Sequence, residues 1–343
     1  MDAASRQRTQ YRYIYFLRVA ATLLVIMLHC VSPYVASLEL FGTKTWWMSN
    51  IIGIITRAGV PLYFMMSGYL LLSREDTASF KQFYKKRLKR ILAPFIIWDV
   101  AYFLYFSLTS GNGLSIARFL SELIDHGSAY HLWFLYTIAG IYLVAPFFKR
   151  LTDSLTNKQI MGLLAIMAFP VAVRPFINTV TPVYIFLLEP LFGGYLAFFI
   201  LGCLLGRVAL RPIARAALYV GGIAGVVVGS AGNYLLSSPD GLDLVFNGGY
   251  QLIHFFSATA LFVFFKYSKT VEGAGHLRMA KTFSAATFSA YLSHVMVLDF
   301  LQRNVPMPTP AIAVLANFGA TAIICFAFSL LVLKFKPLRQ LLA

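Results

Sequence analysis

Long apolar stretches recur along this chain, and short polar segments separate them. An α-helix of about 20 predominantly apolar residues is long enough to cross the hydrocarbon core of a bilayer. The pattern therefore predicts transmembrane helices and leaves few gaps that would hold a soluble domain. We expect ten spans, near residues 14–35, 48–72, 88–108, 132–148, 160–176, 183–206, 214–236, 250–266, 284–302 and 311–333.

Two of these spans contain residues that interrupt helices. The second is long and carries Gly59, Val60 and Pro61, where we expect a break or a kink. Proline lacks a backbone donor, and inside a membrane the freed carbonyl groups must find partners within the protein. The fifth span is short and contains Pro170.

Composition supports the same fold class. Hydrophobic residues make up 59% of the 343 positions and charged residues only 12%, and the mean hydropathy is +0.72. The first apolar stretch is too long for the hydrophobic segment of a cleaved signal peptide. We therefore expect an all-α integral membrane protein, with a single transmembrane domain covering residues 1–343.

The distribution of basic residues predicts the orientation. The net charge is +16, but the basic residues follow the span boundaries rather than forming a nucleic-acid-binding surface. With ten spans the two termini share a side, and that side holds 23 of the 29 basic residues. Because cytoplasmic loops are enriched in Lys and Arg, both termini are expected in the cytoplasm. The opposite loops hold only Lys44, Arg118, Arg174 and Arg303.

The basic segment from Lys81 to Arg90 is denser than orientation requires. One interpretation is attraction to anionic lipid head groups. The other is a cytoplasmic mouth that binds a phosphate-rich ligand. Arg87 and Arg90 lie three positions apart and would share one helix face.

Arg18 and His29 are the most informative polar residues, because both lie inside the first apolar stretch. An ionisable side chain in a membrane span is costly and marks a functional site by default. Eleven residues of α-helix make about three turns plus roughly 20°, so both side chains share a face. The pair predicts a site with a fixed cation near one membrane surface and a titratable imidazole deeper in the bilayer.

Other polar residues inside the spans are weaker candidates, since structural hydrogen bonds within the bundle explain them equally well. No pair has the spacing of a metal site. The three cysteines are expected to be small buried apolar residues, and Gly202 with Gly206 indicates close helix packing. The remaining ionisable residues of this group are Arg57, Asp99, Glu189, His254, His294 and Asp299.

Several motifs resemble the membrane acyltransferase-3 family, and together they span most of the chain. Arg18 and His29, separated by ten residues, resemble the signature of the family's first helix. The strings that carry the rest are Gly59-Val-Pro-Leu-Tyr-Phe-Met-Met-Ser-Gly-Tyr-Leu70, Arg87-Leu-Lys-Arg90-Ile-Leu-Ala-Pro94, Tyr130-His131-Leu-Trp133-Phe134, Phe199 to Arg207 and Ser289 to His294. The nearest subgroups are proteins like the enterobacterial-common-antigen O-acetyltransferase and the membrane domain of vancomycin-resistance serine racemases.

The resemblance implies an acyltransferase of a bacterial inner membrane, most simply an O-acetyltransferase. The donor would be cytoplasmic acetyl-CoA or another acyl-CoA, used as a substrate with no permanently bound cofactor. The acceptor would be a hydroxyl of an envelope glycan or lipid-linked sugar. The sequence printed here has no fused racemase or esterase-like domain, so we expect a single transmembrane catalytic core with membrane lipids and no nucleic acid as partners.

Each polar residue of these motifs can be given a role in acyl transfer. Neutral His29 would act as general base, with or without an acyl-histidine intermediate. Donor binding is expected from Arg18, Arg87, Arg90 and Ser67; Arg57, the backbone near Gly59 and Ser67 are candidates for the oxyanion site, and His131 with Trp133 for the acceptor.

Two other functions stay open from the sequence. Buried Arg, Asp and His residues also suit a proton-coupled transporter or flippase of an acylated or lipid-linked substrate. The second is a non-catalytic lipid-binding scaffold, which predicts that loss of both Arg18 and His29 is tolerated.

His131 and Trp133 also have an alternative role. They equally fit an interfacial aromatic anchor.

Overall fold

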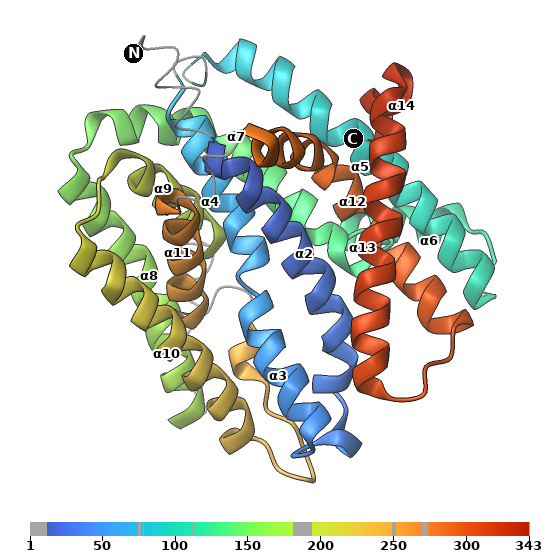
Figure 1. The fold of residues 1–343 in the computed structure, drawn as a ribbon. Helices are drawn as coiled ribbons and strands as arrows, with labels where there is room; N and C mark the ends of the chain where they lie inside the picture. Colours follow the sequence, from blue (N-terminus) through green and yellow to red (C-terminus); the bar gives the residue numbers. More distant parts are fainter. Residues whose placement is uncertain are drawn as a thin grey trace. The chain divides into compact units, whose positions relative to one another are not determined.

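The computed structural model is helical, as the apolar pattern predicts (Figure 1). Every regular element in the described part of the chain is an α-helix or a short 3-10 helix. The described residues are 12–74, 77, 79–111, 113–180, 194–248, 252–268 and 274–342. Chain contacts divide the protein into two compact units, Met1–Arg74 with Phe148–Lys281 (unit 1) and Glu75–Phe147 with Thr282–Ala343 (unit 2).

Unit 1 holds the N-terminal helices and the middle of the chain. Helices α2, α3 and α4 pack together, α4 packs against α9, and α10 packs against both α3 and α11. Its elements are α2 (Arg12–Val35), η1 (Leu38–Leu40), α3 (Lys44–Thr56), α4 (Gly59–Leu72), α8 (Asn157–Val180), α9 (Gly194–Arg207), α10 (Pro212–Leu236), η4 (Val245–Asn247) and α11 (Leu252–Tyr267).

Unit 2 is built around two long helices and a C-terminal pair. The Trp98 indole donates to the Leu342 carbonyl at 3.4 Å, which ties α14 to α5. Two helices, α7 and α12, each contribute residues to both units. The elements are α5 (Phe80–Ser110), α6 (Ile116–Asp125), η3 (Tyr130–Leu132), α7 (Trp133–Ser154), α12 (Ala274–Asn304), α13 (Pro310–Lys334) and α14 (Lys336–Leu342).

Seven helical segments in the described part of the chain are long and apolar enough to cross a membrane. Two shorter apolar helices, α9 and α11, fall at the predicted sixth and eighth spans. The protein is therefore a multi-pass membrane protein by length and composition. The count of ten, the cytoplasmic placement of the termini and the single domain stay predictions; residues 181–193, with Glu189, lie outside the described residues.

The predicted interruption of the second span is present. Helix α3 ends at Thr56, Arg57 and Ala58 form a turn, and α4 begins at Gly59. Pro61 is the third residue of α4, where the missing donor costs nothing because the first-turn amides have no intrahelical partner. The turn leaves Arg57 at the junction of two helices.

The Gly202 and Gly206 pair packs as predicted, against α4. A Cβ atom on Gly202 would lie 1.9 Å from the Met65 carbonyl oxygen, and one on Gly68 would lie 1.7 Å from that of Phe199. No side chain fits at such distances, so α4 and α9 are held backbone to backbone. This contact fixes the orientation of α4, which carries Ser67.

Apolar side chains face outward on several helices. On α10, Ile223 is 67% exposed and Leu235 is 77% exposed, and on α13 Ile323 is 72% exposed. Exposed apolar faces of this extent suit a lipid environment rather than water. The three cysteines are all buried.

Candidate active site

One face of α2 carries the Arg18 and His29 pair. The helix runs without interruption from Arg12 to Val35, so the eleven-residue spacing brings both side chains to one face. Thr22 lies on the same face, one turn beyond Arg18. Arg18 and His29 are half-buried, whereas Thr22 is completely buried.

Tyr63 of α4 contacts this face through Thr22. The two hydroxyl oxygens are 2.5 Å apart, and the Thr22 hydroxyl also donates to the Arg18 carbonyl at 2.9 Å. Because threonine has one hydroxyl proton, the Tyr63 hydroxyl is the donor to Thr22. The Arg18 guanidinium is an electrostatic neighbour of the same tyrosine.

The two helices run antiparallel, which fixes the depth of other residues. A Cβ on Gly59 would touch Val25 at 3.0 Å, and the Tyr13 and Tyr69 rings lie 5.8 Å apart. Ser67 falls between Tyr63 and Tyr69, and this register places it at about the depth of Arg18. Ser67 is half-buried, one turn from Tyr63 on the same side of α4.

Arg57 lies nearer to the depth of His29. A Cβ on Gly53 of α3 would lie 3.9 Å from Val31 of α2. Arg57 comes one turn after Gly53 and two residues before Gly59, so its backbone is level with about residue 27 of α2, within one turn of His29. Its Nε is buried and has no hydrogen-bond partner among the described residues. A free buried donor at this depth suits a site for developing negative charge.

The neighbours of Arg57 were not singled out together by sequence. The Tyr195 hydroxyl and the His254 ring both interact electrostatically with its guanidinium. Tyr195 stacks on Phe64 of α4, with ring centroids 4.7 Å apart. Neither Tyr63 nor Tyr195 was predicted as a site residue, because nothing in a single sequence shows which tyrosine hydroxyl reaches another helix.

Unit 2 contains the other four predicted site residues. Arg87 on α5 is half-buried, and the side chain of Arg90 lies outside the described residues. His131 is 1% exposed, and its Nε2 lies 3.4 Å from the Leu292 carbonyl oxygen. Trp133 follows on α7 and is half-buried.

The surroundings of His131 are aromatic and hydrogen-bonded. Its ring lies 5.0 Å from the Tyr102 ring and 5.0 Å from the His294 ring, measured between centroids. The Tyr291 hydroxyl donates to the His131 carbonyl at 2.7 Å. His131 is therefore an interior residue of unit 2 rather than an exposed platform. The roles predicted for it and for Trp133 in acceptor binding stay predictions.

Two other ionisable residues have local structural partners. Asp99 is completely buried and accepts a hydrogen bond from the Ser128 amide at 2.7 Å. Asp299 accepts from Tyr105 at 2.8 Å and from Arg303 at 2.7 Å. The contacts of Asp299 agree with its structural interpretation, whereas Asp99 Oδ2 is buried and has no hydrogen-bond partner among the described residues.

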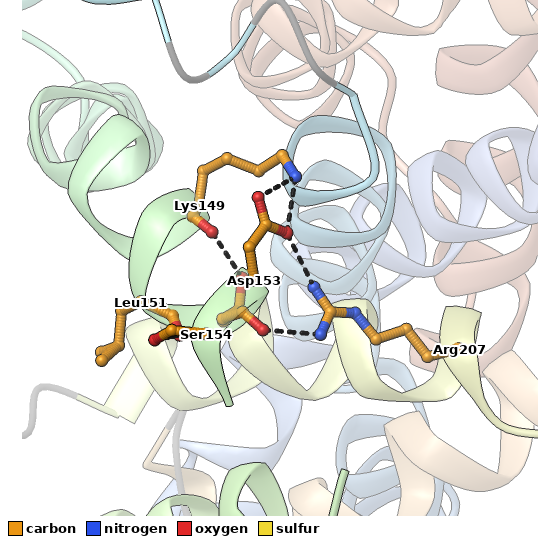
Figure 2. Close-up of polar contacts among 6 residues, drawn as sticks. Lys149, Leu151, Asp153, Ser154 and Arg207 are labelled. Carbon is orange, nitrogen blue, oxygen red and sulfur yellow. Dashed lines mark hydrogen bonds and ion pairs between the residues drawn. The ribbon is translucent and has the colours of Figure 1, made fainter. Parts of the chain in front are cut away.

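A separate ion-pair cluster ties the end of α7 to the end of α9 (Figure 2). Asp153 accepts from Lys149 at 2.6 Å and from Arg207 at 3.3 Å. Arg207 also donates to the Thr152 carbonyl at 2.7 Å. The cluster satisfies Arg207 inside the protein, so we assign that residue a structural role.

The chain matches the sequence model of the acyltransferase-3 family, described as an acyltransferase domain, over residues 11–331. The chain belongs to this family. The family expected from the motifs is thereby confirmed, and it covers both units.

Among curated proteins, the matches are racemases from enterococci. The chain is 28% identical to a serine/alanine racemase of Enterococcus gallinarum over 127 residues, which are 34% of this chain and 16% of that protein. It is 28% identical to an amino-acid racemase of Enterococcus faecalis over 147 residues, which are 40% and 20% of the two chains. The matched segments thus cover no more than a fifth of those relatives. No solved structure matches the chain.

Proposed function

We propose that this acyltransferase-3 protein is an integral membrane O-acyltransferase that moves an acyl group, most simply acetyl, from cytoplasmic acyl-CoA to a hydroxyl of an envelope glycan or glycolipid. The observation that supports this most is the shared face of Arg18, Thr22 and His29 on α2, fixed to α4 by the Thr22–Tyr63 hydrogen bond. It gives one helix a cation, a positioning contact and an imidazole.

The donor end of the reaction is assigned to the basic residues. Charge-assisted hydrogen bonds from arginine bind phosphate well. Arg18 and Ser67 lie at one depth of unit 1, near the end predicted to face the cytoplasm. Arg87 and Arg90 lie in the N-terminal part of α5, in the basic segment predicted for the same side. The pantetheine arm would then reach inward along α2 towards His29.

The chemical step needs one base and one oxyanion site. The acceptor oxygen attacks the thioester carbonyl carbon while His29 removes the hydroxyl proton. A tetrahedral oxyanion forms, and the Arg57 guanidinium stabilises its charge. The intermediate collapses, the carbon–sulfur bond breaks, and the proton held by His29 goes to the departing CoA thiolate. The products are the acyl ester and free CoA.

The first prediction is that His29→Ala abolishes transfer without preventing membrane insertion. Purified protein in detergent would be incubated with acetyl-CoA and an extract of envelope glycans, and CoA release and ester formation would be measured. Loss of general base catalysis is expected to lower the rate by about 10²–10⁴-fold. His276→Ala is the matched control, because His276 is an exposed histidine of α12.

Two results would contradict the proposal. Full transfer by the His29→Ala protein would exclude His29 as the base. If the wild-type protein consumes no acyl-CoA but moves a substrate across the membrane of sealed vesicles, the transporter is favoured instead.

A further inference from the structure

A set of polar side chains is buried in unit 1, towards the end marked by Val35 of α2. We call it the buried polar column. It comprises residues of α3, α10, η4 and α11, together with Arg57 in the turn after α3, and α10 packs against each of the other three elements. Its members are Asn50, Arg57, Ser230, Asn233, Asn247 and His254.

Hydrogen bonds link the members at the Val35 end. The Asn233 amide donates to Asn50 Oδ1 at 2.9 Å and to Asn247 Oδ1 at 3.0 Å. The Asn50 amide donates to the Ser230 carbonyl at 2.9 Å. Asn50 and Asn233 are both completely buried, whereas Asn247 is half-buried in the connection between α10 and α11.

The column continues deeper through His254 and Arg57. His254 is completely buried, and its Nε2 lies 2.9 Å from the Phe246 carbonyl oxygen, next to Asn247. A carbonyl only accepts, so Nε2 carries the proton and Nδ1 of the neutral ring is an acceptor. Arg57, an electrostatic neighbour of His254, ends the column within about one helical turn of the depth of His29.

Four atoms of the column have no partner among the described residues. They are Ser230 Oγ, Asn233 Oδ1, His254 Nδ1 and Arg57 Nε. A polar group left unpaired in a membrane interior costs several kcal/mol, so leaving all of these atoms unpaired would destabilise the folded protein considerably. Groups from a ligand would satisfy them.

The chemistry of these atoms selects the kind of ligand. Two are acceptors, one is a hydroxyl that both donates and accepts, and one is a cationic donor. An acyl chain would leave all four unpaired, and phosphate oxygens that carry no proton would leave both acceptors unpaired. Several hydroxyl groups on one rigid ring offer donors and acceptors together, which matches a sugar.

We propose that the buried polar column binds the sugar ring of the acceptor and leads its reacting hydroxyl to His29. This inference rests on the proposed function. It adds the residues of the acceptor site and the direction of approach, from the membrane side opposite to Arg18. Acyl-CoA and the sugar would then meet at the depth of His29 and Arg57.

The test uses Ser230→Ala, which removes an unpaired hydroxyl and no hydrogen bond made by that hydroxyl within the protein. Binding of p-nitrophenyl β-D-glucoside and of p-nitrophenyl N-acetyl-β-D-glucosaminide to the full-length purified protein would be measured by saturation-transfer NMR. We expect the wild type to bind at least one, and Ser230→Ala to bind it about 3–10-fold more weakly, as for one lost neutral hydrogen bond. His254→Gln, which keeps a donor for the Phe246 carbonyl, should weaken binding similarly.

Ser257→Ala is the control, because the hydroxyl of this buried serine already donates to the Ile253 carbonyl at 2.9 Å. It should bind both glycosides like the wild type, and all variants should bind acetyl-CoA equally well. No glycoside binding by the wild type would overturn the proposal. Unchanged binding by Ser230→Ala and His254→Gln would also overturn it, and a simultaneous rise in melting temperature would indicate that these polar groups are left unpaired in the protein.

Failure of the proposed function has a different outcome. If the protein binds the glycoside through Ser230 and His254 but transfers no acyl group, the sugar site stands and the acyltransferase proposal is wrong. If His29-dependent acyl transfer is found while the column variants have no effect, the acyltransferase proposal stands and the sugar site is wrong.

Discussion

The Thr22–Tyr63 hydrogen bond is the contact that fixes the candidate donor site at the scale of single residues. Tyr63 donates to Thr22, which in turn donates to the Arg18 carbonyl. The tyrosine therefore positions the turn of α2 that carries Arg18. It does so without being expected to touch the reacting atoms.

Tyr63→Phe should consequently act on donor binding more than on the chemical step. It keeps the ring and removes a hydrogen bond worth about 1 kcal/mol, so the KM for acetyl-CoA should rise about 5-fold. The kcat should change by less than about 2-fold, because the base and the oxyanion site are intact. Steady-state kinetics with Tyr219→Phe, a half-exposed tyrosine of α10, would provide the comparison. An equal loss in kcat would show that Tyr63 takes part in the chemistry.

The shared face of Arg18 and His29 could be predicted from the sequence because helical periodicity alone determines it, while the roles of the two residues stay predictions. It also selected Arg57 and Ser67, since a charge in a span and a motif serine stand out. The partners of these residues could not be predicted. Tyr63 is 41 positions from Thr22, and only the antiparallel packing of α2 and α4 brings them together.

At the scale of elements, the interface between α4 and α9 depends on glycine. The carbonyl oxygens of Met65 and Phe199 occupy the places where the Cβ atoms of Gly202 and Gly68 would be. Small residues let membrane helices approach closely, which strengthens packing where no hydrophobic effect drives association. The two glycines act as a reciprocal pair.

Gly202→Ala should therefore destabilise the protein although alanine favours helices. The new methyl group meets backbone, which cannot move like a side chain, so a cost of about 1–3 kcal/mol or more is expected. Thermal unfolding in detergent, monitored by size-exclusion chromatography, would show a lower midpoint temperature for Gly202→Ala than for the wild type. Gly162→Ala is the control on α8, where nothing lies within 4 Å of a new Cβ; it should unfold at or above the wild-type temperature. Equal midpoints for the two variants would contradict the close contact.

The extent of three helices was predictable, whereas α5 and α12 begin well before the predicted spans and the assembly of the helices could not be predicted. Apolar runs located α2, α10 and α13 to within two residues at each end. The amphipathic helix α6 and the C-terminal α14 were not predicted, because both are too short to read as spans. The column of Asn50, Asn233 and His254 was also missed, since its residues are polar singly and form a cluster only after three helices pack.

At the scale of the whole molecule, the proposed function requires a defined orientation in the membrane, because acyl-CoA and acceptor are proposed to arrive from opposite sides. The three native cysteines are buried, so membrane-impermeant maleimide should label the wild type weakly. Lys158 and Asp240 are exposed, one at the start of α8 and the other between α10 and α11. In the ten-span arrangement three spans separate them, which places them on opposite sides.

Single variants Lys158→Cys and Asp240→Cys would be labelled in intact and in permeabilised cells. We expect Asp240→Cys to react in intact cells and Lys158→Cys only after permeabilisation, because basic loops stay in the cytoplasm. Labelling of both from the same side would mean that an even number of spans connects them. The sixth predicted span, of which only Gly194–Arg207 is described as helix, would then be the first to revise. Labelling with the two sides exchanged would instead keep the spans and reverse the approach of both substrates.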